Sequence, residues 1–215
     1  ELVDRRLHIR VCSRGAVTAN QHSLAAQDGL AEDLQPSLPK RRPGLHDVGD
    51  RLTFVTCRQE GGAAYMAEAH GKLTGRPGIA LVTRGPGACN AAIGIHTAAQ
   101  DSTPMLVLVG QVDTGSTDRE AFQEIDYRCM FGSVAKWVAQ VDRAERIPEY
   151  LSRAFVTAMS GRPGPVVLAL PEDVLATRAM AAHLPRAMPV ASAPAEADVR
   201  AAHALLANAA RPLVL

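Results

Sequence analysis

The residue best suited to chemistry is Glu60. It follows a β-branched and aromatic run and opens a stretch rich in glycine and alanine, so its carboxylate would lie among small apolar neighbours. Poor solvation raises the proton affinity of a carboxylate, as a general acid or base near neutral pH requires. The alternative is that Glu60 only complements the dipole of a helix N-terminus, worth a few tenths to about 1 kcal/mol. Both interpretations place Glu60 at the start of a helix.

The second candidate is the turn Gly85-Pro86-Gly87, with Asn90 three residues later. Such a turn lets a ligand approach the backbone closely before a helix N-terminus. The pattern is not Gly-x-Gly-x-x-Gly, because Asn90 occupies the last position, and it lacks a Walker lysine. A nucleotide site is therefore weakly supported, and a tight structural turn is the alternative.

Other polar residues have ordinary structural interpretations. A lone histidine on a small-residue helix, such as His70 or His96, is more often packed than catalytic. Gln123 and Lys136 would ordinarily be surface groups beside a loop and a strand.

Composition limits the function further. A formal net charge of +1, with 21% charged residues, argues against a nucleic-acid surface, which needs concentrated Lys and Arg. No apolar run approaches the roughly 18 residues of a membrane span, and no signal peptide opens the chain, so the default expectation is a cytoplasmic protein. The four cysteines are irregularly spaced and predict neither a zinc site nor a disulfide framework: Cys12, Cys57, Cys89 and Cys129.

Strand and helix patterns alternate along the chain, which predicts a doubly wound α/β fold with a parallel sheet. The run at 79–83 is continuously apolar, as expected for a strand covered on both faces. The expected strands are 52–57, 79–83, 105–109, 134–138 and 166–170, and the expected helices are 60–73, 88–100 and 144–160. The glycines and proline of 75–78 should end the first helix.

The predicted domain spans residues 52–175. An Ala- and Pro-rich linker follows at 176–197, and a helix at 198–210 with a strand from Pro212 indicates a second α/β domain that begins at 198–215 and is cut off. Residues 1–51 are atypical, and the prolines of 36–43 predict poor order. A weak amphipathic helix near Ser23–Leu34 is the alternative.

Taken together, the motifs resemble the N-terminal pyrimidine-binding domain of thiamine-diphosphate-dependent enzymes of the acetolactate synthase group. The resemblance covers about residues 52–175 in the right order and is specific only as a set. The motifs that carry it are Arg58-Gln-Glu60-Gly-Gly-Ala-Ala, Gly71-Lys-Leu-Thr-Gly-Arg-Pro-Gly78, Arg84-Gly-Pro-Gly-Ala-Cys-Asn90, Gln100-Asp-Ser-Thr-Pro104, Gly110-Gln-Val112, Phe122-Gln-Glu124 and Gly161-Arg-Pro-Gly-Pro165.

The resemblance implies an enzyme that decarboxylates a 2-keto acid and condenses the product with a second carbonyl compound. Glu60 matches the glutamate that hydrogen-bonds the aminopyrimidine, so that the cofactor's exocyclic nitrogen can remove the thiazolium proton. The pyrimidine side would be formed by Gly85, Pro86, Gly87 and Asn90, and the substrate side by Phe122, Gln123 and Lys136. The family site lies between subunits, which implies a homo-oligomer, a dimer or a tetramer.

Two departures qualify these expectations. Residues 1–50 lack the family's Gly-x-Pro-Gly segment, which suggests a shifted reading frame or a misjoined segment. The Gly-Asp-Gly and downstream Asn of the diphosphate-binding domain, which hold Mg²⁺ and the diphosphate, do not occur, so the 215 residues are expected to supply half a site and to bind thiamine diphosphate weakly or undetectably. FAD use is left open.

Three alternatives remain. One is a 2-keto acid decarboxylase or another carboligase of the same group, and another is a non-catalytic fragment or partner subunit. A Rossmann-type dinucleotide domain is disfavoured by the missing third glycine and by the absence of an acidic residue closing the next strand.

Overall fold

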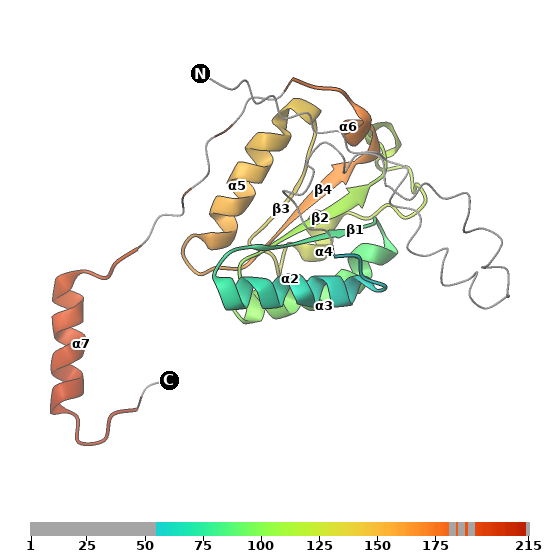
Figure 1. Ribbon diagram of the computed structural model, residues 1–215. Coiled ribbons are helices and arrows are strands. Elements are labelled where there is room, and N and C mark those ends of the chain that lie inside the picture. The colour runs from blue at the N-terminus through green and yellow to red at the C-terminus, as the bar shows by residue number, and fades with distance from the viewer. Residues whose placement is uncertain (1–54, 181–183, 185–187, 189–191, 214–215) are drawn as a thin grey trace.

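The computed structural model describes residues 55–180, 184, 188 and 192–213, and its centre is a four-stranded sheet (Figure 1). The strands are β1 (Gly78–Val82), β2 (Met105–Gln111), β3 (Trp137–Gln140) and β4 (Pro165–Pro171). They pair in the order β1-β2-β4-β3, and every pair is parallel. The predicted α/β fold with a parallel sheet is confirmed.

Helices precede, connect and follow the strands. They are α2 (Glu60–Thr74), α3 (Pro86–Gln100), α4 (Tyr127–Phe131), α5 (Ile147–Met159), α6 (Glu172–Ala176) and α7 (Glu196–Asn208), with 3-10 turns at Thr114–Ser116 and Ala144–Arg146. Gly75 caps α2 in the left-handed conformation, with φ 67°, and donates its N–H to Gly71 O, so the predicted end of this helix is confirmed.

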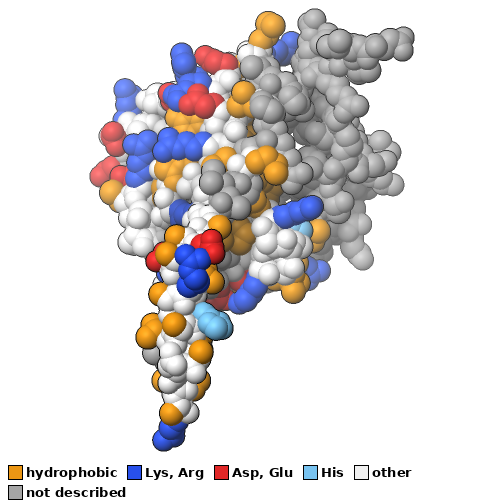
Figure 2. Space-filling model, turned by 90° about the vertical axis from the view of Figure 1, so that its left-hand side faces the viewer, with side chains coloured by type: hydrophobic (Ala, Val, Ile, Leu, Met, Phe, Trp, Pro, Cys, Tyr) orange, Lys and Arg blue, Asp and Glu red, His pale blue; other side chains and the backbone are white. Residues whose placement is uncertain are grey.

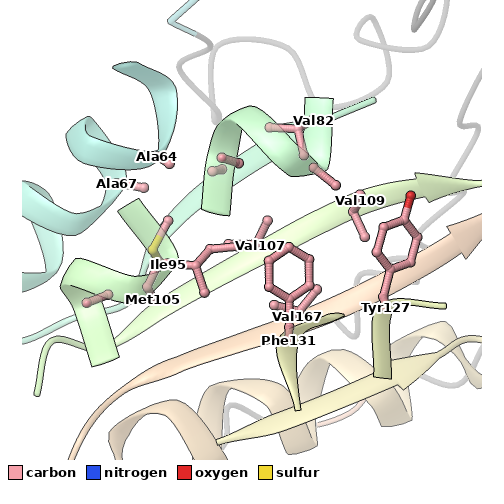
Figure 3. Close-up of a cluster of buried hydrophobic side chains, with 14 of the residues drawn as sticks. Ala64, Ala67, Val82, Ile95, Met105, Val107, Val109, Tyr127, Phe131 and Val167 are labelled. Atoms are coloured by element: carbon pink, nitrogen blue, oxygen red, sulfur yellow. The ribbon is translucent and has the colours of Figure 1, made fainter. Parts of the chain in front are cut away.

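One face of the sheet is covered by α2, α3 and α4 (Figure 3). Small residues of α2 and α3 and two aromatic residues of α4 pack against alternate residues of β1, β2 and β4. The largest of these buried side chains are Ile95, Met105, Val107, Val109, Tyr127 and Phe131. Alanine and glycine on the helices let them lie close to the strands, as the small-residue composition of 60–73 predicts.

The opposite face is covered by α5, which packs through Ala154 and Ala158 on Leu106, Val166 and Leu168. The chain passes over the position of β4 to form β3 and then returns, so the connection between β3 and β4 runs in the reverse direction. In right-handed crossovers such a reversal places the connecting helix on the other face of the sheet. The two helical layers follow from this reversal.

The expectation that both faces of β1 are covered is wrong. Ile79 and Leu81 are 56% and 60% exposed, although they are in register with Leu106 and Leu108 of β2 on the α5 side. Among the described residues, α5 reaches β2, β4 and β3 on this face, and β1 is an edge strand. A continuous apolar run therefore does not show that helices pack on both faces of a strand, when that strand lies at the edge of a sheet.

Three other strand predictions also need correction. Val55 to Cys57 form no strand, while 52–54 lie outside the described residues. The strand expected at 134–138 is β3, which begins at Trp137 rather than at Val134, because its pairing with β4 starts with Trp137 opposite Val166. Pro212 and Leu213 are not in a strand, and 214–215 are not described.

Of the expectations for the segments outside the main domain, the structure bears only on the helix near the C-terminal end of the chain. The expectations for residues 1–51, including the helix near Ser23–Leu34, lie outside the described residues. The helix expected at 198–210 is present as α7, but all its residues are exposed. The domain limits 52–175 and the linker 176–197 remain predictions.

Candidate functional site

The candidate site lies at the carboxyl edge of the sheet, where β1 runs through Thr83 and Arg84 into Gly85 and α3. Gly85 adopts φ 59° and ψ −112°, and Pro86 begins α3. The first turn of α3 is tight, because a Cβ on Gly87 would lie 2.6 Å from Cγ2 of Thr83. The glycines are therefore required by the backbone path.

Tyr127 braces this turn. Its hydroxyl accepts a hydrogen bond from the Gly85 N–H at 3.0 Å and donates one to Gly110 O, at the end of β2, at 3.1 Å. The ring is buried between the sheet and α4 (Figure 3). Burial raises the pKa of Tyr127, so the hydroxyl keeps the proton that it donates. Sequence analysis missed this residue, because 42 positions separate it from Gly85.

Gln123 packs directly against Gly85. A Cβ on Gly85 would lie 2.7 Å from the Cβ of Gln123, which itself adopts φ 66°. Asp118 and Glu120 of the same loop also have positive φ, a conformation that L-residues rarely adopt. Phe122 is 80% exposed beside Gln123. The structure therefore brings the two predicted substrate-side residues Phe122 and Gln123 to the edge where Gly85 lies.

Glu124 closes this loop. Its carboxylate accepts hydrogen bonds from the N–H groups of Asp118 and Ala121, at 2.7 and 3.1 Å. Gln111, at the end of β2, donates from Nε2 to Ile125 O at 2.8 Å. These bonds tie the loop to itself and to the sheet.

Glu60 lies at the head of α2, half-buried, next to α3. The preceding Gln59 is the N-cap, and its Oε1 accepts a hydrogen bond from the Gly62 N–H at 2.7 Å. Asn90 of α3 donates from Nδ2 to Oε2 of Glu60 at 3.0 Å. A Cβ on Gly87 would lie 3.6 Å from the other oxygen, Oε1. Glu60, Gly87 and Asn90 are thus brought together.

Lys136 lies elsewhere. It directly precedes β3, so it is at the amino edge of the sheet, and its ammonium donates to the Thr157 and Ser160 carbonyls, both at 2.6 Å. These carbonyls belong to the C-terminal end of α5, where a cation is favourable. Partial burial lowers the pKa of Lys136. The structure does not bring Lys136 to the carboxyl edge with Glu60 and Gln123.

Ion pairs hold the surroundings of the site together. Arg84, next to Gly85, pairs with Glu172 at the start of α6. On the face that carries α5, acidic and basic side chains are interspersed (Figure 2), and Arg146 bonds both Asp142 and Glu149. This mixed charge agrees with the near-neutral composition.

No group of three His, Cys, Asp or Glu residues able to hold a metal ion occurs among the described residues. Within the same part of the chain, no helix combines the length and the apolar character that a membrane crossing needs.

Comparisons with known proteins match this domain. Residues 40–130 match the family described as thiamine pyrophosphate enzyme, N-terminal TPP binding domain. The chain is 43% identical over 127 residues to an acetolactate synthase catalytic subunit, mitochondrial, of Saccharomyces cerevisiae, covering 59% of this chain and 18% of the relative. It is 47% identical over 131 residues to the acetolactate synthase isozyme 3 large subunit of Escherichia coli, covering 61% of this chain and 23% of the relative. A probable acetolactate synthase large subunit of Methanocaldococcus jannaschii is 42% identical over 123 residues, covering 57% and 21%.

These matches confirm the resemblance drawn from the sequence motifs. They also show its extent, since the matched region spans only about a fifth of the length of these relatives.

Proposed function

We propose that this chain forms the pyrimidine-binding half of a thiamine diphosphate site, because residues 40–130 match the family described as thiamine pyrophosphate enzyme, N-terminal TPP binding domain. The complete enzyme would be acetolactate synthase-like: it would decarboxylate a 2-keto acid and join the product to a second carbonyl compound. The relatives carry the acetolactate synthase name, which supports this class of reaction.

The observation that carries the proposal is the position of the Glu60 carboxylate. It lies at the head of α2 beside the first turn of α3, and its Oε1 faces a residue that has no side chain, Gly87. No hydrogen bond to Oε1 is present among the described residues, so this oxygen is available to accept one from a ligand. The residues present therefore fit an aminopyrimidine with an N–H group directed at the carboxylate.

When bound, thiamine diphosphate supplies the carbanion chemistry that amino acid side chains cannot. The chain's own part is to bind and orient. Glu60 would accept a hydrogen bond from the pyrimidine ring and so hold a proton at that atom, while the backbone of Gly85, Pro86 and Gly87 would line the ring. Gln123, held against Gly85, and the exposed Phe122 would line the substrate side.

Other components would come from outside the 215 residues. We propose that Mg²⁺ and the diphosphate are held by a diphosphate-binding domain, because the sequence has no Gly-Asp-Gly motif. The family resemblance implies a site that lies between subunits, so a homo-oligomer, at least a dimer, would complete the site. FAD would be a further cofactor of the complete enzyme, as in part of the family.

The test is an NMR titration of the 215-residue chain with thiamine at millimolar concentration, since half a site should bind weakly. We expect shifts at Glu60, Gly85, Gly87 and Asn90, and their loss in Glu60→Gln, because an amide N–H₂ replaces one accepting oxygen. Glu145→Gln is the matched control and should bind like the wild type, because Glu145 lies on the 3-10 turn Ala144–Arg146 after β3, at the other end of the strand order from β1. Shifts confined to other regions, or unchanged binding by Glu60→Gln, would refute the proposal.

A further inference from the structure

The two oxygens of the Glu60 carboxylate have different surroundings. Oε2 accepts the hydrogen bond from Asn90 Nδ2 at 3.0 Å. Oε1 lies toward Gly87, and no hydrogen bond to it is present among the described residues. The bond from Asn90 restrains the position of Oε2 and so limits the directions in which Oε1 can point.

The Asn90 side chain is placed by backbone packing between α2 and α3. A Cβ on Gly61 would lie 3.1 Å from Asn90 O, and a Cβ on Gly94 would lie 2.6 Å from the Cβ of Ala64. The two helices therefore touch through glycines one residue after Glu60 and one turn after Asn90. Such short contacts leave little freedom for the distance between the two side chains.

We propose that Asn90 is a positioning residue for Glu60: it holds Oε2 so that Oε1 is presented to an N–H donor of the ligand beside Gly87. The inference rests on the proposed function, because it names the residue that orients the proposed proton acceptor. It differs from the expectation drawn from the family resemblance, in which Asn90 is itself a cofactor-binding residue. Asn90 then acts on the ligand only through Glu60.

The test is a double-mutant cycle on the 215-residue chain. The probe is 4-aminopyrimidine, whose amino group carries N–H donors in both protonation states of the ring. Its dissociation constant is measured by NMR titration for the wild type, Glu60→Ala, Asn90→Ala and the double variant. The bond lost in Asn90→Ala lies within the protein and only orients the acceptor, so binding should weaken by about 3- to 10-fold, the range of an ordinary net hydrogen bond. The double variant should bind no more weakly than Glu60→Ala alone, because a residue that acts through another shows strong coupling.

His96→Ala is the matched control, since His96 is exposed on the same helix and should leave the dissociation constant unchanged. Thermal unfolding of each variant identifies any that fails to fold. If the losses from the two single variants multiply in the double variant, Asn90 contacts the probe itself and the inference is overturned. An Asn90→Ala chain that binds like the wild type overturns it as well.

A second measurement needs no ligand. The side-chain N–H₂ resonances of Asn90 should move in Glu60→Ala and stay in place in Glu145→Gln, because only the first removes the acceptor. Resonances unchanged in Glu60→Ala would overturn the positioning role while leaving the proposed thiamine site standing. Failure of the wild-type chain to bind either thiamine or 4-aminopyrimidine would overturn the proposed function and, with it, the ligand-facing role of Oε1.

Discussion

Replacing Gly94 with alanine should force α2 and α3 apart. The new Cβ would lie 2.6 Å from the Cβ of Ala64 and 2.9 Å from its carbonyl carbon. Carbon atoms pack at about 3.5–4.0 Å, so the helices must separate by about 1 Å. Ala64 cannot rotate away, because both atoms are fixed to the backbone of α2, and it is fully buried.

The expected loss of stability follows from two opposing terms. Overpacking costs about 1–3 kcal/mol, and the higher helix propensity of alanine offsets about 1 kcal/mol. The backbone contact favours the upper part of the range, so a net loss of about 1–2 kcal/mol is expected. With a urea slope of about 2 kcal/mol/M, the unfolding midpoint should fall by about 0.5–1 M.

Urea unfolding followed by circular dichroism measures this shift. Gly62→Ala is the control on α2, because a Cβ there meets only Oε1 of Gln59, at 3.9 Å, and its midpoint should equal or exceed that of the wild type. A Gly94→Ala midpoint at or above the wild-type value would refute the close-packing argument.

Three further predictions concern the edges of the sheet. Asp126→Ala removes the N-cap of α4 and should lower the free energy of unfolding by about 1 kcal/mol at pH 7. Hydrogen bonds from the Cys129 thiol and then from its N–H lower the pKa of Asp126. The stabilisation is therefore lost as the carboxylate is protonated, and the urea midpoints of variant and wild type should converge as the pH falls below about 4. Lys136→Met should lower the free energy of unfolding by about 0.5–1 kcal/mol through the lost bonds to the end of α5, without altering thiamine binding in the NMR titration. Gly85→Ala combines a φ of 59° with a 2.7 Å contact to Gln123, so it should speed proteolysis of the loop 117–126 relative to the wild type.

The sequence predicted most of the elements that position the site. The glycine at 75 ends α2, and the apolar runs of β2 and β4 are long enough to be buried strands whatever their neighbours. The start of the strand expected at 134–138 was misplaced by three residues. The corresponding strand, β3, has only four residues, and its start is set by pairing with Val166 of β4. Exposure of Ile79 and Leu81 depends on strand order, which local periodicity does not contain.

The candidate site was predictable only where its residues belong to local sequence motifs. Glu60, Gly87 and Asn90 belong to motifs near in sequence, and the structure brings them together through the contact of α2 with α3. Tyr127 and Lys136 depend on distant partners: the first on Gly85 and Gly110, the second on the end of α5. A single side chain gives no sign of such a partner.

The direction of the helices explains why a carboxylate suits the head of α2. Both α2 and α3 begin at the carboxyl edge of the sheet, since each is followed by a strand that starts at the opposite edge. Two parallel helices side by side place their positive ends together, which is unfavourable without a negative charge nearby. Glu60 lies in the first turn of α2 and is bonded to Asn90 of α3, so its charge offsets both ends. Glu60→Gln should therefore reduce stability by a few tenths to about 1 kcal/mol even without ligand, and thiamine binding must be compared at equal folded fractions.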